Sequence, residues 1–328
     1  MFLHFHVKDS SNAGEIRRQT AQLALELKFN TVESEKISIV INEMCSNILK
    51  HAKSGEVIIS KDSQSIHLLA LDKGPGMSNL VECLKDGYST QGTQGTGLGA
   101  MKRQSTFFDL FTAQGKGTVL YSRFTPSDVL LEDAVLDVGA VMIPYPGENV
   151  CGDGWSLLPL SSIRQKLLVC DGLGHGLLAN AASEAAISSF KAGAGRVPLE
   201  DINAIHNALR STRGAAIAIA DIHIDKEKLD YAGMGNISAG LISRKSVKKL
   251  ISYNGTAGVQ LRKVQAMTYP LEDDWILIMH SDGLGTHWSL SDYPGLQLKH
   301  PLIIAGVLYR DFTRRTDDVT VVVVRKKC

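Results

Sequence analysis

Aspartates adjoin apolar runs at four places after residue 150 of this 328-residue sequence, and glycines flank most of them. An aspartate at the end of a buried strand projects its carboxylate from a fixed edge, and a neighbouring glycine lets the backbone turn tightly and offer a carbonyl. Hard divalent cations prefer such oxygens, and two cations about 3.5–4 Å apart would generate a hydroxide and hold a phosphoryl group. Convergence of the four places therefore predicts a pocket for Mg²⁺ or Mn²⁺. Its members are Asp153, Asp171 with Gly172, Asp282, and Asp317 with Asp318. Each place alone is more often an ordinary turn, so the prediction depends on the four together.

A second polar set lies in the first half of the chain. Glu43, Asn47 and His51 are spaced four apart in a segment with helical periodicity, so one helix face carries all three unless it is simply solvated. The segment LDKGPGM (71–77) puts an aspartate at a strand end before two glycines, and QGTQGTGLG (91–99) runs into a helix start. Free N–H groups at a helix start bind phosphate, although one glycine-rich loop is weak support by itself.

The elements that must position these residues divide the chain near residues 125–133. Before this point, apolar spacing predicts helices over 13–28, 33–52 and 98–106, the second capped by Thr31, and strands over 56–60, 66–72, 108–113 and 117–124. After it, strand follows strand, interrupted by helices over 176–192 and 199–210. We expect an α+β protein of layered sandwiches, with domains over 1–125 and 133–328 and a connector over 126–132.

Composition narrows the class of protein. The sequence is 44% hydrophobic and 21% charged, with a net charge of +1, so nothing favours binding to nucleic acid. Its longest apolar runs are too short to span a bilayer. Five scattered cysteines without CxxC spacing favour reduced thiols, so we expect a cytoplasmic protein.

The order GD, DGLGHG, SDGLG, DDVT, with YAGMGNISAGL at 231–241, resembles the SpoIIE-type branch of the metal-dependent type 2C protein phosphatases over about residues 133–326. The resemblance implies an α-β-β-α sandwich in which Asp171 bridges two metals, the Gly172 carbonyl holds one, and Asp282 and Asp317 hold the other. Asp153 would position metal-bound water or act as a ligand. Asp317 is preferred to Asp318, because the family's variants keep the first acidic position. The segment GDGWSLL lacks the second acidic residue of fuller members, and His175 is either a general acid or structural.

The ordered set of an ExxxN helix, DxGxG, GTGLG and GKGT resembles the GHKL-type ATP-binding fold of the anti-sigma-factor-like serine kinases, over about residues 1–124. The resemblance implies a two-layer α/β sandwich that binds ATP. Asn47 would hold Mg²⁺ on the phosphates, Asp72 would read the adenine amino group, and Glu43 would act as the base toward a substrate hydroxyl. The remaining nucleotide contacts would come from Gly74 and Gly76 at the base, Gly95, Gly97 and Gly99 at the triphosphate, and Thr118 near the adenine.

Together the two resemblances imply a cytoplasmic signalling protein that joins an ATP-binding serine kinase module to a Mn²⁺/Mg²⁺-dependent Ser/Thr phosphatase. Its partners would be STAS-type antagonist proteins or sigma-factor regulators. In the alternative, the first domain only docks the partner, with ATP as a gating ligand, and only the phosphatase turns over. A chaperone or topoisomerase-like role of the GHKL fold is disfavoured, because the sequence has no transducer domain. The oligomeric state is not predicted.

Overall fold

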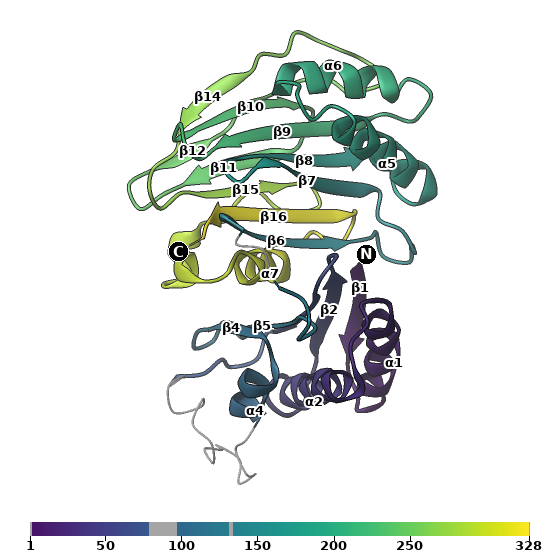
Figure 1. The fold of residues 1–328 in the computed structure, drawn as a ribbon, viewed down its shortest axis with the longest axis vertical. Coiled ribbons are helices and arrows are strands. Elements are labelled where there is room, and N and C mark those ends of the chain that lie inside the picture. Colours follow the sequence, from purple (N-terminus) through teal and green to yellow (C-terminus); the bar gives the residue numbers. More distant parts are fainter. Residues whose placement is uncertain (1, 79–96, 131–133, 328) are drawn as a thin grey trace. The chain divides into compact units, whose positions relative to one another are not determined.

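The computed structural model describes residues 2–78, 97–130 and 134–327, which form two compact units (Figure 1). Unit 1 contains Met1–Asp133 and Ser289–Arg310, and unit 2 contains Ala134–Trp288 and Asp311–Cys328. The chain therefore leaves unit 2 after Trp288, contributes a segment to unit 1, and returns to unit 2 at Asp311. The domains expected from the sequence, 1–125 and 133–328, do not place Ser289–Arg310 with the first domain. As boundaries between two family-like domains, they stay a prediction.

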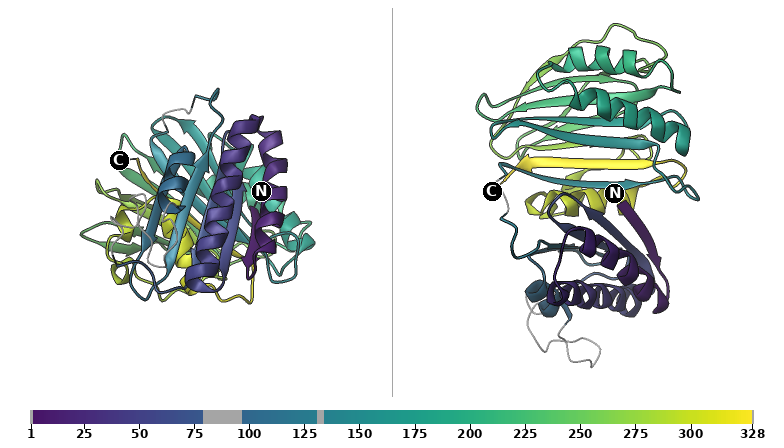
Figure 2. Two further views of the ribbon diagram at one scale, coloured as in Figure 1. Left: turned by 90° about the horizontal axis from the view of Figure 1, so that it is seen from below. Right: turned by 45° about the vertical axis from the view of Figure 1, so that its right-hand side comes forward.

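Unit 1 is built on a five-stranded antiparallel sheet of order β1-β2-β3-β5-β4. Three helices cover one face of this sheet, so the expected α/β layering is present (Figure 2). The strands are β1 (Phe2–Val7), β2 (Gly55–Lys61), β3 (Ile66–Asp72), β4 (Phe107–Thr112) and β5 (Thr118–Phe124). The helices are α1 (Ser11–Glu26), α2 (Thr31–Asn47) and α4 (Gly97–Gln104).

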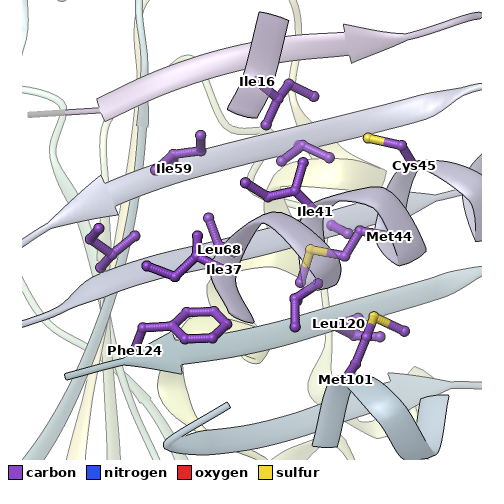
Figure 3. Close-up of a cluster of buried hydrophobic side chains, with 14 of the residues drawn as sticks. Ile16, Ile37, Ile41, Met44, Cys45, Ile59, Leu68, Met101, Leu120 and Phe124 are labelled. Carbon is purple, nitrogen blue, oxygen red and sulfur yellow. The ribbon is translucent and has the colours of Figure 1, made fainter. Parts of the chain in front are cut away.

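The face of this sheet that α1, α2 and α4 cover holds a large buried hydrophobic cluster (Figure 3). Helix α2 presents Ile37, Ile41 and Met44 to the sheet, at the three- and four-residue spacing of one helix face. Asn30, and not the expected Thr31, caps this helix: its side chain accepts from the Glu33 N–H, and the Glu33 carboxylate accepts from the Asn30 N–H. Asn30 is in extended backbone, which lets its side chain reach the orphan donors of the first turn.

The opposite face of the same sheet is covered by helix α7 (Pro301–Phe312), whose residues up to Arg310 belong to unit 1. A Cβ added to Gly306 would lie 3.0–3.3 Å from side-chain atoms of Leu69, Leu71 and Val119, so this helix packs closely on strands β3 and β5. The short 3₁₀ turns η2 (Leu290–Asp292) and η3 (Leu296–Leu298) precede it. A third layer is thus added to the expected two-layer sandwich.

Unit 2 contains two sheets, and we confirm the expected α+β class from them and their covering helices. The six-stranded sheet has the order β13-β10-β9-β8-β7, with β14 paired to β10, and the five-stranded sheet has the order β12-β11-β15-β16-β6. The first sheet contains β7 (Asp153–Ser161), β8 (Arg164–Gly172), β9 (Ala215–His223), β10 (Lys228–Met234), β13 (Ser252–Tyr253) and β14 (Met267–Pro270). The second contains β6 (Leu136–Ile143), β11 (Ser238–Ile242), β12 (Val247–Lys249), β15 (Ile276–His280) and β16 (Val319–Lys326).

Helices α5 (Leu177–Lys191) and α6 (Pro198–Ala208) cover the six-stranded sheet and share a buried cluster with it (Figure 1). All nine residues of β9 are buried, as expected for a central strand with both faces covered. The helix that follows β15 is α7, most of which belongs to unit 1. No helix in the part of the chain that the structure describes is long and apolar enough to cross a membrane.

Candidate metal centre and nucleotide site

Two of the predicted carboxylates lie side by side on neighbouring strands of the six-stranded sheet. Asp153 is the first residue of β7, Asp171 is the last but one of β8, and the two are paired in the antiparallel register. Directly paired residues project to the same face of a sheet, so both carboxylates emerge on one side at one end of this strand pair. Gly172 must lack a side chain here, because a Cβ would lie 2.2 Å from the Ala179 carbonyl oxygen of helix α5.

The other carboxylates lie at the ends of two neighbouring strands of the five-stranded sheet. Asp282 follows β15 by two residues, and Asp317 and Asp318 directly precede β16. Because β15 and β16 are antiparallel neighbours, the end of one lies beside the start of the other. Two hydrogen bonds fix this corner: the Ser281 N–H donates to the Thr320 carbonyl (3.0 Å), and the Thr320 N–H donates to the Ser281 hydroxyl oxygen (2.9 Å).

Ser281 joins the two sheets at this point, because its hydroxyl donates to Asp153 Oδ2 at 2.6 Å. The other oxygen of Asp153 is buried without a hydrogen-bond partner, as is Oδ2 of Asp318. Asp318 Oδ1 accepts from the Tyr145 N–H at 2.8 Å. Buried carboxylate oxygens without partners are costly in water-free surroundings, and a bound cation removes that cost.

The electrostatics of the cluster also favour a cation. Burial and the nearby charges of Asp282, Asp317 and Asp318 raise the pKa of Asp171 to about 8. Burial, together with the charge of Asp171, raises the pKa of Asp153 well above its ordinary value, and burial raises that of Asp317. Like charges that cannot all ionise in one place are neutralised by a divalent metal, so the donor set fits Mg²⁺ or Mn²⁺.

The arrangement is open. Among the described residues, no three of these carboxylates bring ligand oxygens within 4.8 Å of one another. Asp317 is half-buried and interacts electrostatically with Asp282, whereas Asp318 is buried and interacts with Asp153, and both interact with Asp171. The two adjacent residues therefore differ in burial and in the charges that act on them.

Several residues around the cluster were not singled out from the sequence. Asn236 donates its side-chain amide to Asp282 Oδ2 at 2.7 Å, and Tyr145 stacks on the His175 ring with centroids 4.1 Å apart. His175 Nδ1 lies 2.9 Å from Glu148 Oε1. The sequence signals that could have drawn attention to them are the Gly-Asn pair in YAGMGN and the turn-rich PYPGEN segment before the first aspartate.

Unit 1 carries the predicted nucleotide residues at one end of β3 and β5. Asp72 ends β3 opposite Thr118, and its Oδ1 accepts the N–H groups of Gly74 (2.8 Å) and Thr118 (3.2 Å). Burial raises the pKa of Asp72. Gly76 has φ +70° and a Cβ there would lie 2.1 Å from the Ala113 carbonyl oxygen, so only glycine fits this turn.

The helix side of this site is formed by α2 and the start of α4. A Cβ on Gly97 would lie 2.8 Å from Glu43 Oε2 and 3.7 Å from both amide atoms of Asn47, so these three residues lie close together. His51 lies beyond α2, which ends at Asn47, in the π-helical turn η1 (Ile48–Ala52), and it interacts electrostatically with Asp72. Gly99 is buried within α4. Gly95 lies outside the described residues.

Comparisons with known proteins match the two halves separately. The model of the Histidine kinase-like ATPase domain matches residues 7–124, and that of Stage II sporulation protein E (SpoIIE) matches residues 162–287. The serine/threonine-protein kinase RsbT of Bacillus subtilis (strain 168) is 32% identical over 106 residues, which are 31% of this chain and 80% of RsbT. The phosphoserine phosphatase RsbX of the same organism is 29% identical over 143 residues, which are 42% of this chain and 69% of RsbX.

Solved structures are similar to part of the chain. A chain from a structure of the bacterial stressosome, described as a modular system adapted to control secondary messenger signaling, has 27% identity and a TM-score of 0.54, and covers 58% of this chain and 99% of its own. RsbX in complex with magnesium has 23% identity and a TM-score of 0.54, over 61% of this chain and 99% of RsbX, which shows a shared fold.

Fold and site thus define a signalling protein with a histidine kinase-like ATPase domain followed by a protein phosphatase domain. The chain belongs, through its first domain, to the family of the serine/threonine-protein kinase RsbT, and its second domain is a SpoIIE-type phosphatase domain similar to RsbX.

Proposed function

We propose that this chain is a Mg²⁺- or Mn²⁺-dependent Ser/Thr phosphoprotein phosphatase joined to an ATP-binding serine kinase module, and that both act on a STAS-type partner protein. The observation that carries the phosphatase proposal is the placement of five carboxylates at strand ends of the two sheets, with the pKa of Asp171 raised to about 8 by burial and by the charges of Asp282, Asp317 and Asp318. A site with so much uncompensated negative charge is suited to metal-assisted phosphoryl chemistry.

In this proposal the carboxylates of Asp171, Asp282 and Asp317 and the carbonyl of Gly172 would hold the cations. Asp153 and Asp318 serve the inner side of the cluster, where each has a buried oxygen without a hydrogen-bond partner. When bound, such a metal pair supplies an activated water and neutralises charge on the phosphoryl group.

The chain's own residues keep this set in position. The Ser281 hydroxyl holds Asp153, the Asn236 amide holds Asp282, and the Tyr145 N–H holds Asp318. Each of these hydrogen bonds leaves the second oxygen of its carboxylate for a ligand. Such supporting bonds fix ligand orientation in metal sites.

The nucleotide proposal assigns each predicted residue of unit 1 a contact with ATP. Asn47 holds Mg²⁺ on the phosphates, Asp72 reads the adenine amino group, and Glu43 is the base toward the substrate hydroxyl. Thr118 and the glycines complete the cradle, with Gly74 and Gly76 at the base and Gly95, Gly97 and Gly99 at the phosphates. The meeting of Gly97 with Glu43 and Asn47 supports this, because it joins the glycine-rich segment to the acidic helix face.

The partner class rests on the relatives. RsbT is a serine/threonine-protein kinase and RsbX a phosphoserine phosphatase. One chain with both kinds of domain is therefore suited to phosphorylate a serine and to remove that phosphate again. We propose a STAS-domain antagonist or a sigma-factor regulator as that substrate. In the second candidate function, the first domain binds ATP as a gating ligand and docks the partner, and only the phosphatase is active. The two candidates differ in whether Glu43 supports phosphoryl transfer.

The test is a time course with radiolabelled ATP, Mg²⁺ and STAS-domain proteins of the same genome, on the wild type, Asp171→Asn, Glu43→Ala and the double variant. Label that accumulates on a STAS protein with Asp171→Asn, and not with the double variant, supports both activities. The docking candidate is supported instead if the wild type removes phosphate from a prelabelled partner while no variant transfers label from ATP to it. The exposed Asp225→Asn variant is the matched control for Asp171. A wild type that releases no phosphate with either metal from any phosphorylated STAS protein would overturn the proposal.

A further inference from the structure

Two histidines share one face of the first strand of unit 1. His4 and His6 are two residues apart on β1, so both project to the same side of the sheet. Glu56 on β2 is paired directly with His6 in the antiparallel register, and it lies on the same side as both histidines. None of the three belongs to the predicted nucleotide site or to the acidic cluster.

The three side chains converge. One ligand atom from each lies within 4.8 Å of the other two, and among the described residues this is the only group of histidine, cysteine or acidic side chains that does so. His4 Nε2 is 2.9 Å from Glu56 Oε2, and the two imidazole rings meet edge to face with centroids 4.7 Å apart. The side chains of His4 and Glu56 are 18% and 12% exposed, whereas His6 is exposed. An ion can therefore reach the three residues from solvent on the side of His6.

The chemistry of this set differs from that of the acidic cluster. Two imidazole nitrogens and one carboxylate suit zinc and neighbouring transition metals, whereas Mg²⁺ prefers oxygens alone. Three protein ligands leave a fourth position for water or another donor. We propose that His4, His6 and Glu56 form a second metal site, selective for Zn²⁺ or a chemically similar divalent transition metal over Mg²⁺.

A supporting hydrogen bond is already in place. The Tyr309 hydroxyl of α7 donates to Glu56 Oε2 at 2.8 Å, which fixes the carboxylate as second-layer partners do in metal sites. The next residue, Arg310, donates from Nη1 to the Asp72 carbonyl at 3.1 Å. The proposed site is therefore one residue along α7 from a contact with the predicted nucleotide site.

The test is isothermal titration of the full chain with Zn²⁺ in saturating Mg²⁺, which keeps oxygen sites filled. We expect one Zn²⁺ site per chain, and binding weakened by at least about ten-fold in His6→Ala and in Glu56→Gln. Tyr309→Phe should weaken it by roughly ten-fold. His67→Ala is the matched control, because His67 lies on β3 of the same sheet but pairs with Asp62 and Tyr121. Co²⁺ absorption in each variant reports whether imidazole nitrogens are ligands.

His6→Ala removes an exposed ring, so loss of binding in a variant that keeps the wild-type melting temperature is loss of a ligand and not of the fold. Binding that survives in Asp171→Asn separates this site from the acidic cluster. The proposal is overturned if the wild type takes up no Zn²⁺ in Mg²⁺, or if His6→Ala and Glu56→Gln bind it as tightly as the His67→Ala control.

Discussion

Asp171 lies where the charges of three other carboxylates meet in a buried setting, and this makes metal binding depend on pH. Without metal, the folded protein keeps a proton on this group up to about pH 8, whereas the unfolded chain loses it near the ordinary value of 3.8. The folded state thus binds more protons between these values. The contribution of Asp171 to the free energy of unfolding of the metal-free protein therefore falls as pH rises through this window.

Mg²⁺ should raise the melting temperature of the protein by an amount that depends on pH. Mg²⁺ binds the ionised carboxylate, so its stabilising effect should grow as pH rises from about 6 toward about 8, in step with ionisation of Asp171. Differential scanning calorimetry with and without Mg²⁺ measures this at each pH. Asp171→Asn should remove most of the pH dependence, and an equal Mg²⁺ shift at both ends of the range in the wild type would contradict the prediction.

Sequence reasoning could find the aspartates because their neighbours carry the signal. Asp153 stands beside glycines at the start of a largely apolar run, and Asp171 and Asp282 stand beside a glycine at the end of one, so all three can be found from local pattern alone. Ser281 and Tyr145 could not be found in this way. Their contribution is a hydrogen bond to a residue 128 or 173 positions away, and no local pattern encodes that partner.

The turn between β4 and β5 offers a matched pair of glycines. Gly115 and Gly117 have φ of +73° and +69°, so alanine is about equally strained by backbone conformation at either position. They differ in surroundings: a Cβ at Gly115 meets nothing within 4 Å, whereas one at Gly117 would lie 2.0 Å from the Asp72 carbonyl oxygen.

We therefore expect Gly115→Ala to destabilise the protein by about 1 kcal/mol and Gly117→Ala by at least roughly twice as much. Gly117→Ala should also displace Asp72 and Thr118, and so weaken the binding of a fluorescent ATP analogue, while Gly115→Ala leaves it near the wild-type level. Urea unfolding and nucleotide titration measure the two effects. Equal losses of stability in both variants would show that the close approach to Asp72 costs nothing.

Element prediction succeeded where one face of an element is apolar. Helices α1 and α2 bury one side, and their periodicity indicated them to within a few residues. Helix α7 was missed because all its residues from Pro301 to Arg310 are buried, so PLIIAGVLYR has no polar face to reveal a helical period. Strand β1 was missed because it is short and its two histidines, His4 and His6, alternate with apolar residues. This alternation was not interpreted as a strand.

At the scale of the molecule, unit 1 is assembled from two separate stretches of chain. Residues 289–310 supply the layer that covers Leu69, Leu71 and Val119, so a fragment that ends at the predicted boundary lacks it. We predict that residues 1–130 alone expose this apolar face and aggregate, as large uncovered apolar patches do. Joining residues 289–312 to this fragment through a flexible linker should restore a soluble monomer.

Size-exclusion chromatography with light scattering distinguishes the two fragments. A linked segment in which Tyr309 and Arg310 are replaced by alanine controls for the mere presence of extra residues, because it removes the contacts with Glu56 and Asp72. If residues 1–130 alone form a stable monomer that binds nucleotide, the third layer is dispensable.

The excursion of residues 289–310 also sets an order of events during synthesis on the ribosome. Strands β1 to β5 leave the ribosome early, yet the helix that covers their second face is made only after nearly all of unit 2. A domain usually folds as soon as its chain has emerged, but here the first domain must wait with one sheet face bare. We therefore expect nascent unit 1 to be a substrate for chaperones until α7 has been translated, and a ribosome that stalls before that helix leaves one face of the sheet uncovered.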